Sequence, residues 1–151
     1  MVFEDFTADW VGVSGLAEVS EAAVLAFARE FDPQPQHMDR AGAAGSMFGQ
    51  LVASGWHTAA ITMRLQLEAG LDQVEGGLMG AGIERIAWPV PVVPGDTLQA
   101  TVEVVDTRVS RSRPDRGLVR LRTTTRNQKD EIVMEMTATV VAPRRDLLTN
   151  L

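Results

Sequence analysis

Apolar residues early in the chain recur with helical spacing. In the segment EAAVLAFAREF, residues 21–31, one helix face collects Val24, Phe27, Ala28 and Phe31. Ser20 precedes this segment and is a favourable N-cap. Pro33 closes it, because proline disfavours helical backbone in the residue before it. We therefore predict a first helix that ends near Asp32.

A second helical segment, GWHTAAITMRLQLEA, lies between Ser54 and Gly70. Ser54 can cap its first turn, and Gly70 suits the position just past its end. The first half is small or apolar almost all round, which predicts burial on most faces of this helix. The longest stretch without charged residues, 41–63, includes most of this helix. Its glycines and serines indicate a turn-rich segment followed by a buried helix, and not a membrane span.

The second half of the chain alternates between apolar and polar residues, as strands with one buried face do. One strand is predicted over 79–88, and alternation marks further strands over 98–104, 119–124 and 132–140. A proline-rich turn at 91–96 and the NQKDE turn at 127–131 connect them. Only the 54–69 helix is apolar enough to cover an antiparallel sheet. We therefore predict a single α+β domain over 1–151, with the sheet wrapped around one central helix.

Composition narrows the chemistry that this domain can carry. The absence of cysteine excludes a disulfide framework, a thiolate metal site and a cysteine nucleophile. Two histidines cannot build a multi-histidine centre, so no metal is expected. The net charge of −6 argues against a dedicated nucleic-acid-binding protein. The N-terminal segment MVFEDFTADW is acidic and lacks the features of a secretory signal, which favours a soluble cytoplasmic protein.

The segment FDPQPQH, residues 31–37, brings an acid and a histidine close together in the sequence. Asp32 and His37 are separated by two prolines, which fix φ and stiffen the intervening chain. A carboxylate and an imidazole that converge on one point can hold and activate a water molecule. Judged by residue types alone, a plainer interpretation is favoured, in which Asp32 caps the loop and His37 lies at the surface.

Together with Ala41 and the run SMFGQLVASGW at 46–56, this segment resembles the MaoC-like dehydratase family. The best-understood members of that family are (R)-specific enoyl-CoA hydratases. Their motif has a catalytic Asp, then Asn-Pro, then a catalytic His five positions after the Asp, and Asp32, Pro35 and His37 fall on it. The turn at 91–96 is also typical, and the resemblance covers roughly 15–142. Further downstream matches to the family are Phe48, Gly49 and Gly55.

Two departures from the family bear on the pocket. Gln34 stands where the family has Asn, and it follows Pro33. Ser54 and Gly55 replace the usual His-Gly at the helix start, with His57 two residues later. The acid/base pair is kept, whereas the shape of the pocket, and so the substrate, can differ. Proteins with such a pattern can belong to a NodN-like subgroup of the family.

The resemblance implies a hotdog fold and a homodimer, with acyl-CoA near the subunit boundary. It also implies a hydro-lyase acting on a 2-enoyl or 3-hydroxyacyl thioester, in which Asp32 and His37 hold a water. Asp32 would be the base for water attack at C3, and His37 would take part in protonating C2. The Gly55 N–H, free at the helix start, would stabilise the thioester oxygen. No metal or redox cofactor is required, because coenzyme A is part of the substrate. Other residues expected around the substrate are Ser54, Gln34 and His57.

His57 and the arginines leave alternatives open. His57 can face the substrate or be a hydrogen-bonded core histidine, and we prefer the structural role. Seven arginines lie within 108–126, and Arg suits the phosphates of coenzyme A. Arg120 and Arg122 alternate along a strand and are expected in solvent. The phosphate candidates, in the turn-like segment RVSRSRP, are Arg108, Arg111 and Arg113.

Two other functions compete with the hydro-lyase. A hotdog thioesterase would act on the same kind of ligand, but many such enzymes need a carboxylate on or beside the central helix. Residues 54–67 contain no Asp or Glu, and Glu68 lies near the far end, which argues against a thioesterase. A catalytically idle acyl-thioester-binding protein is the third candidate. The retained Asp32 and His37 argue against it, and Gln34 keeps it open.

Overall fold

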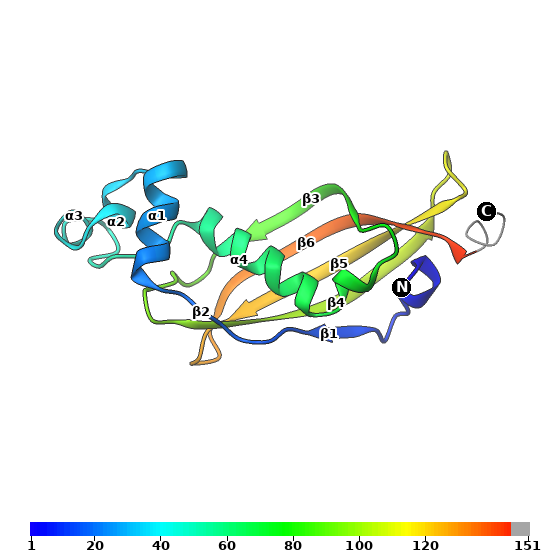
Figure 1. The fold of residues 1–151 in the computed structure, drawn as a ribbon, viewed down its shortest axis with the longest axis horizontal. Coiled ribbons are helices and arrows are strands. Elements are labelled where there is room, and N and C mark those ends of the chain that lie inside the picture. The colour runs from blue at the N-terminus through cyan, green and yellow to red at the C-terminus, as the bar shows by residue number, and fades with distance from the viewer. Residues whose placement is uncertain (146–151) are drawn as a thin grey trace.

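One antiparallel sheet, one long helix against it and a cap of short helices at one end make up the computed structural model, which describes residues 1–145 (Figure 1). Within this part of the chain, no helix is long and apolar enough to cross a membrane. The helices are α1 (Glu21–Phe31), α2 (Pro35–Met38), α3 (Arg40–Ala44) and α4 (Gly55–Glu68), with short 3-10 turns at Phe3–Asp5 and Leu71–Gln73. The strands are β1 (Val11–Val13), β2 (Ala17–Glu18), β3 (Met79–Ala87), β4 (Thr97–Val109), β5 (Arg116–Arg126) and β6 (Ile132–Pro143).

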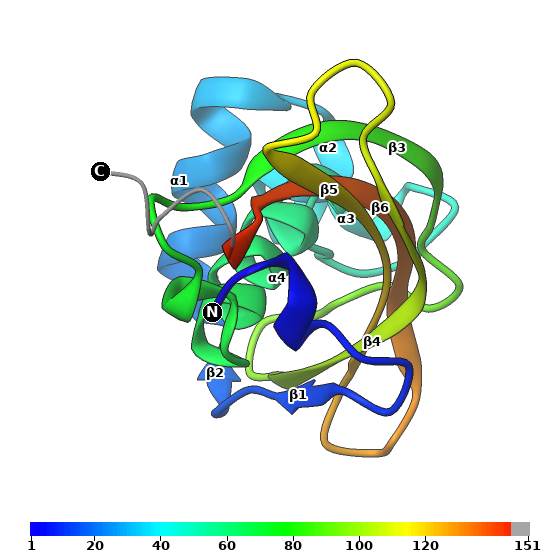
Figure 2. The ribbon, with the colours of Figure 1, turned by 90° about the vertical axis from the view of Figure 1, so that its right-hand side faces the viewer.

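The sheet has the strand order β1-β4-β5-β6-β3, with β2 also paired to β4. Every pairing is antiparallel, and successive hairpins join β4, β5 and β6. Figure 2, turned by 90° from Figure 1, shows the sheet curving around α4. The predicted α+β arrangement of an antiparallel sheet wrapped around one central helix is therefore confirmed.

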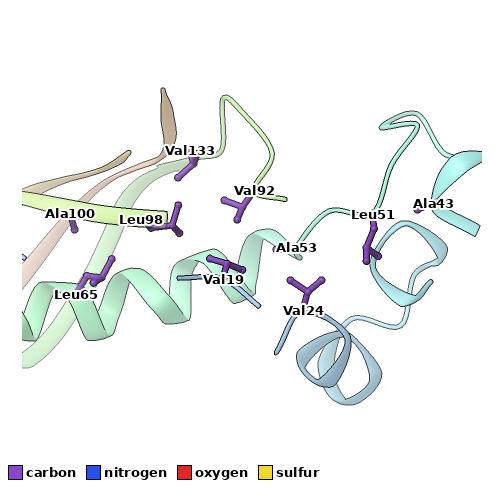
Figure 3. Packing of buried hydrophobic residues seen from close by; sticks show 10 residues of the cluster. All are labelled: Val19, Val24, Ala43, Leu51, Ala53, Leu65, Val92, Leu98, Ala100 and Val133. Carbon is purple, nitrogen blue, oxygen red and sulfur yellow. The ribbon is translucent and has the colours of Figure 1, made fainter. Parts of the chain in front are cut away.

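The core beside the start of α4 joins elements that are distant in sequence (Figure 3). Val24 of α1, Val92 of the turn before β4 and Val133 of β6 are each no more than 2% exposed. They belong to the same buried cluster as Ala53, which lies just before the helix. This packing holds the N-terminus of α4 against the cap formed by α1, α2 and α3.

The face of α4 that turns inward is more polar than the sequence predicts. Its buried residues are His57, Thr58, Thr62, Leu65 and Gln66. Thr62 Oγ1 lies 2.9 Å from Thr125 Oγ1 on β5, and Gln66 Nε2 donates to Thr123 Oγ1 at 2.6 Å. The expectation of burial on most faces, drawn from the first half of the helix, is wrong at Trp56, which is 60% exposed. In the second half, Met63 and Leu67 are also 48% and 39% exposed.

Three local details differ from what the sequence predicts. The first helix forms as predicted, with Ser20 Oγ accepting from the Ala23 N–H at 3.1 Å, but Phe31 at its end is 67% exposed. The stiff segment after it contains the helical turn α2, because Pro35 is tolerated at the first helical position. Alternation fails at the start of β6, where Val133 is an extra residue between two paired neighbours, so both it and Met134 are buried.

Candidate active site

Asp32 and His37 converge where the cap of short helices meets the start of α4. Asp32 is the C-cap of α1, and its N–H donates to the Ala28 carbonyl at 2.9 Å. His37 lies in α2, which begins at Pro35, and its N–H donates to the Gln34 carbonyl at 3.0 Å. His37 Nε2 lies 3.4 Å from Asp32 Oδ2, so the two side chains face each other.

A backbone carbonyl fixes the orientation of the His37 ring. Its Nδ1 lies 2.7 Å from the Val52 carbonyl oxygen. A carbonyl oxygen can only accept a hydrogen bond, so Nδ1 carries a proton. Val52 is held in turn, because its N–H donates to the Gln36 carbonyl at 3.0 Å. The side chain is only 7% exposed, and Nε2 is the ring nitrogen that faces the Asp32 carboxylate.

Two side-chain donors hold the Asp32 carboxylate, one at each oxygen. Gln34 Nε2 donates to Oδ1 at 2.6 Å, and Ser54 Oγ donates to Oδ2 at 2.6 Å. Burial raises the pKa of Asp32, but the hydrogen bonds from Ser54 and Gln34, together with the charge that His37 carries when its ring is protonated, outweigh this effect. The pKa of Asp32 therefore lies below its ordinary value, and the group is a carboxylate at neutral pH.

Glycine at the first position of α4 lets an indole ring lie against the helix start. A Cβ at Gly55 would come within 2.9 Å of the Trp88 ring, closer than real Cβ atoms approach their neighbours. Trp88 follows β3 and meets Trp56 edge-on, with ring centroids 5.4 Å apart. As the first helical residue, Gly55 has no acceptor within the helix for its N–H. This donor, at the positive end of the helix dipole, suits a ligand's carbonyl oxygen.

A cavity of about 300 Å³ extends between His37 and Gly55. This volume lies at the lower end of the range of about 300–1,000 Å³ typical of ligand pockets, which suits a small acyl group. His37 lines the cavity, whereas Asp32 is not among its lining residues, so a water held between the two would sit at its edge. The apolar part of the wall includes Phe48, Val52, Trp88, Val90, Val92 and Val133.

Three predicted substrate contacts have other partners in the structure. The Ser54 hydroxyl and the Gln34 amide both donate to Asp32. His57 lies on another side of α4, stacked on Phe27 of α1 with ring centroids 4.9 Å apart and planes within 8°. It lines a separate cavity of about 460 Å³, beside Arg64. Among the described residues its Nδ1 has no hydrogen-bond partner, and burial lowers the pKa of His57.

The arginines predicted to bind phosphate lie at the opposite end of the sheet from Asp32 and His37 (Figure 1). Arg108 is near the end of β4, paired with Leu118 of β5, and the other two follow in the turn between these strands. Arg113 is engaged by Asp115, with Nε 3.3 Å from Oδ1. A single chain therefore does not bring Arg108, Arg111 and Arg113 to the Asp32–His37 pair.

Sequence reasoning missed two groups that shape the site. Val52 contributes a backbone carbonyl, for which no side-chain signal exists. Gln36 Nε2 donates to Gln34 Oε1 at 3.2 Å, which extends the chain of amides that ends on Asp32. No local signal in DPQPQ indicates this contact, because the helical turn α2 begins at Pro35, between the two glutamines.

Comparisons with known proteins place the chain among similar folds and sequences. The MaoC-like domain model matches residues 8–127. The uncharacterised protein YdeM of Bacillus subtilis is 32% identical over 146 residues, which is 95% of this chain and all of that one. A MaoC-like dehydratase from Rhodospirillum rubrum is 46% identical, with a TM-score of 0.90 over 96% of this chain and 98% of that one.

More distant solved structures share the architecture. An (R)-hydratase from A. caviae involved in PHA biosynthesis is 25% identical, with a TM-score of 0.70 over 91% of this chain and 97% of that one. The Mycobacterium tuberculosis protein Rv0216, described as a double hotdog fold, has a TM-score of 0.78 at 19% identity. It matches over 95% of this chain and 44% of its own length. The fold of this chain is a hotdog.

Proposed function

Since this chain belongs to the MaoC-like domain family, which supports a hydratase or dehydratase, we propose that it acts on acyl thioesters. The proposed reaction adds water across the C2=C3 bond of a 2-enoyl thioester, or removes it from the 3-hydroxyacyl product. Acyl-CoA is the proposed thioester. The observation that carries this proposal is the 3.4 Å approach of His37 Nε2 to Asp32 Oδ2, next to Gly55 and an apolar cavity.

A water that lies beside the two side chains can contact both of them. With Nδ1 bonded to Val52, a neutral His37 offers only a lone pair at Nε2, and the Asp32 carboxylate also only accepts. Two acceptors 3.4 Å apart repel unless a proton or a water donates to both. A water that donates one hydrogen to each group keeps its oxygen lone pairs free to attack carbon.

In the proposed hydration, Asp32 takes one proton from this water as the water oxygen bonds to C3. The π electrons of the C2=C3 bond move toward the thioester, whose oxygen accepts from the Gly55 N–H. The proton then passes from Asp32 through His37 Nε2 to C2, which restores both residues. Nε2 is the ring nitrogen available for this transfer, because Nδ1 is bonded to Val52. Dehydration is the reverse sequence and needs no metal or redox cofactor.

We also propose a homodimer joined through β3 and α4. β3 is an edge strand with exposed residues along most of its length. Trp56 and Met63 on α4, and Met79 and Ile83 on β3, are 48–60% exposed. A groove of about 590 Å³ is lined by both elements. A second copy would satisfy the free backbone groups of the edge and cover these apolar side chains.

Such a dimer can bring the arginines at the β4–β5 turn close to the ligand of the other copy. If the two β3 strands pair about a twofold axis, the Met79 end of one lies beside the Ala87 end of the other. Across the sheet, Met79 is in register with Val141, which is in register with Leu118, the partner of Arg108. Pairing therefore brings the arginine end of one copy toward the active-site end of the other. On this arrangement we propose that Arg108, Arg111 and Arg113 bind the phosphates of coenzyme A.

The test compares two activities of the purified protein. Hydration of crotonyl-CoA is followed by the loss of the ultraviolet absorbance of its conjugated thioester, and hydrolysis of butyryl-CoA by the release of free thiol. We expect hydration and no hydrolysis. Hydrolysis alone would favour the thioesterase. Binding of butyryl-CoA with neither activity would favour the idle binding protein.

A further inference from the structure

We propose that Ser54 is a positioning residue for Asp32. The Ser54 hydroxyl, and not a contact with the substrate, fixes the orientation of the Asp32 carboxylate, so that one chosen oxygen faces His37. This inference rests on the proposed hydro-lyase function. The Ser54 hydroxyl donates to Asp32 Oδ2 at 2.6 Å across 22 positions of sequence. Ser54 is 1% exposed, so water does not compete for this bond.

The oxygen that Ser54 holds is the one that matters for the reaction. Oδ2, and not Oδ1, lies 3.4 Å from His37 Nε2. Rotation of the carboxylate about its Cβ–Cγ bond would move Oδ2 away from the shared water. Gln34 bonds the other oxygen, but Gln34 is exposed, so its bond exchanges with solvent more readily. The buried hydroxyl is therefore the stronger restraint on the orientation of Asp32.

Ser54 also connects Asp32 to the backbone of α4. As N-cap of the helix, its Oγ accepts from the Trp56 N–H at 3.3 Å while donating to Asp32. One hydroxyl group therefore links the positive end of the dipole of a 14-residue helix to the Asp32 carboxylate. Each bond polarises the next, which favours the ionised form of Asp32.

The alternative is that Ser54 only caps α4 and does not position Asp32. The capping contact is 3.3 Å long, whereas the bond to Asp32 is 2.6 Å. Ser20 provides a matched control, because it caps α1 through the Ala23 N–H at 3.1 Å and lies at the opposite end of that helix from Asp32. Loss of either cap costs about 1 kcal/mol, but only Ser54 should change the chemistry of Asp32.

The experiment uses Ser54→Ala, Ser54→Thr and Ser20→Ala in the full chain. The pKa of Asp32 is followed through the NMR shift of its carboxyl carbon, assigned with Asp32→Asn, and the pH profile of kcat/KM is recorded with crotonyl-CoA. For Ser54→Ala we expect the Asp32 pKa and the acid limb of the profile to move to higher pH. We also expect kcat to fall about 10-fold, within the range that misplacement of a catalytic group produces. Ser54→Thr keeps the hydroxyl and should stay near wild type in all three readouts.

The outcomes separate this inference from the proposed function. If Ser54→Ala leaves the Asp32 pKa where it is in wild type, or behaves like Ser20→Ala in all readouts, Ser54 is only a cap and the inference is wrong. If wild type hydrates no enoyl thioester, the proposed function fails. The NMR titration, which needs no activity, still decides whether Ser54 controls the carboxylate. A misfolded Ser54→Thr would leave the decision to Ser54→Ala and the titration.

Discussion

Replacing Asp32 with Asn tests whether the carboxylate acts as a base. Gln34 donates to Oδ1 and Ser54 to Oδ2, so the new amide group turns one acceptor into a donor. The exposed Gln34 amide can flip and the Ser54 hydroxyl can rotate, so no donor is left buried without an acceptor. The free energy of unfolding should therefore change by less than about 1 kcal/mol, as it does for most substitutions without a buried polar defect.

Activity should fall much further than stability. An amide can still accept a hydrogen bond through its oxygen, but neither its oxygen nor its nitrogen is basic enough to take the proton of the attacking water. A positioned general base contributes ~10²–10⁴-fold, which corresponds to about 3–5 kcal/mol of activation free energy. KM should change little, because Asp32 is not among the residues that line the cavity. A loss confined to kcat is the pattern of an interaction made in the transition state.

The assay is the initial rate of crotonyl-CoA hydration over a range of substrate concentrations, with unfolding in urea measured in parallel. Asp39→Asn is the matched control, because Asp39 caps α3 through the Gly42 N–H and Asn caps helices about as well. Asp39→Asn should keep wild-type kinetics. An Asp32→Asn variant with kcat within threefold of wild type would refute the assignment of Asp32 as the base.

Three further predictions address the groups around Asp32. His37→Ala should lower kcat as much as Asp32→Asn, and the double variant should lose little more, because both groups act on one water. Burial lowers the pKa of His57 in the folded chain, so the unfolded chain binds its proton first as pH falls through about 6.5, and stability should drop below that pH. His57→Phe, which can keep the stack on Phe27, should remove this acid-side loss in urea titrations at pH 5 and pH 8. Ile83→Lys should give a monomeric mass in light scattering, and a dimer that persists would show that β3 is not the interface.

The parts of the fold that the sequence predicts are those set by local signals. α1 has a capping serine, a helical period and a closing proline, and β4 and β5 are long enough to show alternation. β1 and β2 have three and two residues and show no period. They form because β4 offers a free edge to the N-terminal segment, a long-range condition that local sequence does not carry.

The candidate site divides in the same way. Asp32 and His37 lie five positions apart, so one stiff segment presents both, and the family motif identifies them. The bond from Ser54 to Asp32 spans 22 residues, and the contact of His37 with the Val52 carbonyl spans 15. Both depend on how the cap of short helices docks on α4. The family motif, and not the residue types alone, therefore indicated the pair, and tertiary packing decided how each atom of it is held.

The polarity of α4 has a consequence for the assembly. Thr62 and Gln66 turn inward because β5 offers them hydroxyl partners, so their burial leaves no unsatisfied polar group. With this face of α4 turned inward, Trp56 and Met63 lie on the exposed face of the helix, where they are 60% and 48% exposed. Covering such side chains is favourable by about 25 cal/mol per Å² of apolar surface that is removed from water. Only a binding partner can provide this stabilisation, because the chain itself leaves these side chains exposed. Because Trp56 also packs against Trp88, the ring that lies against Gly55, the same contact would stabilise the wall of the proposed acyl cavity.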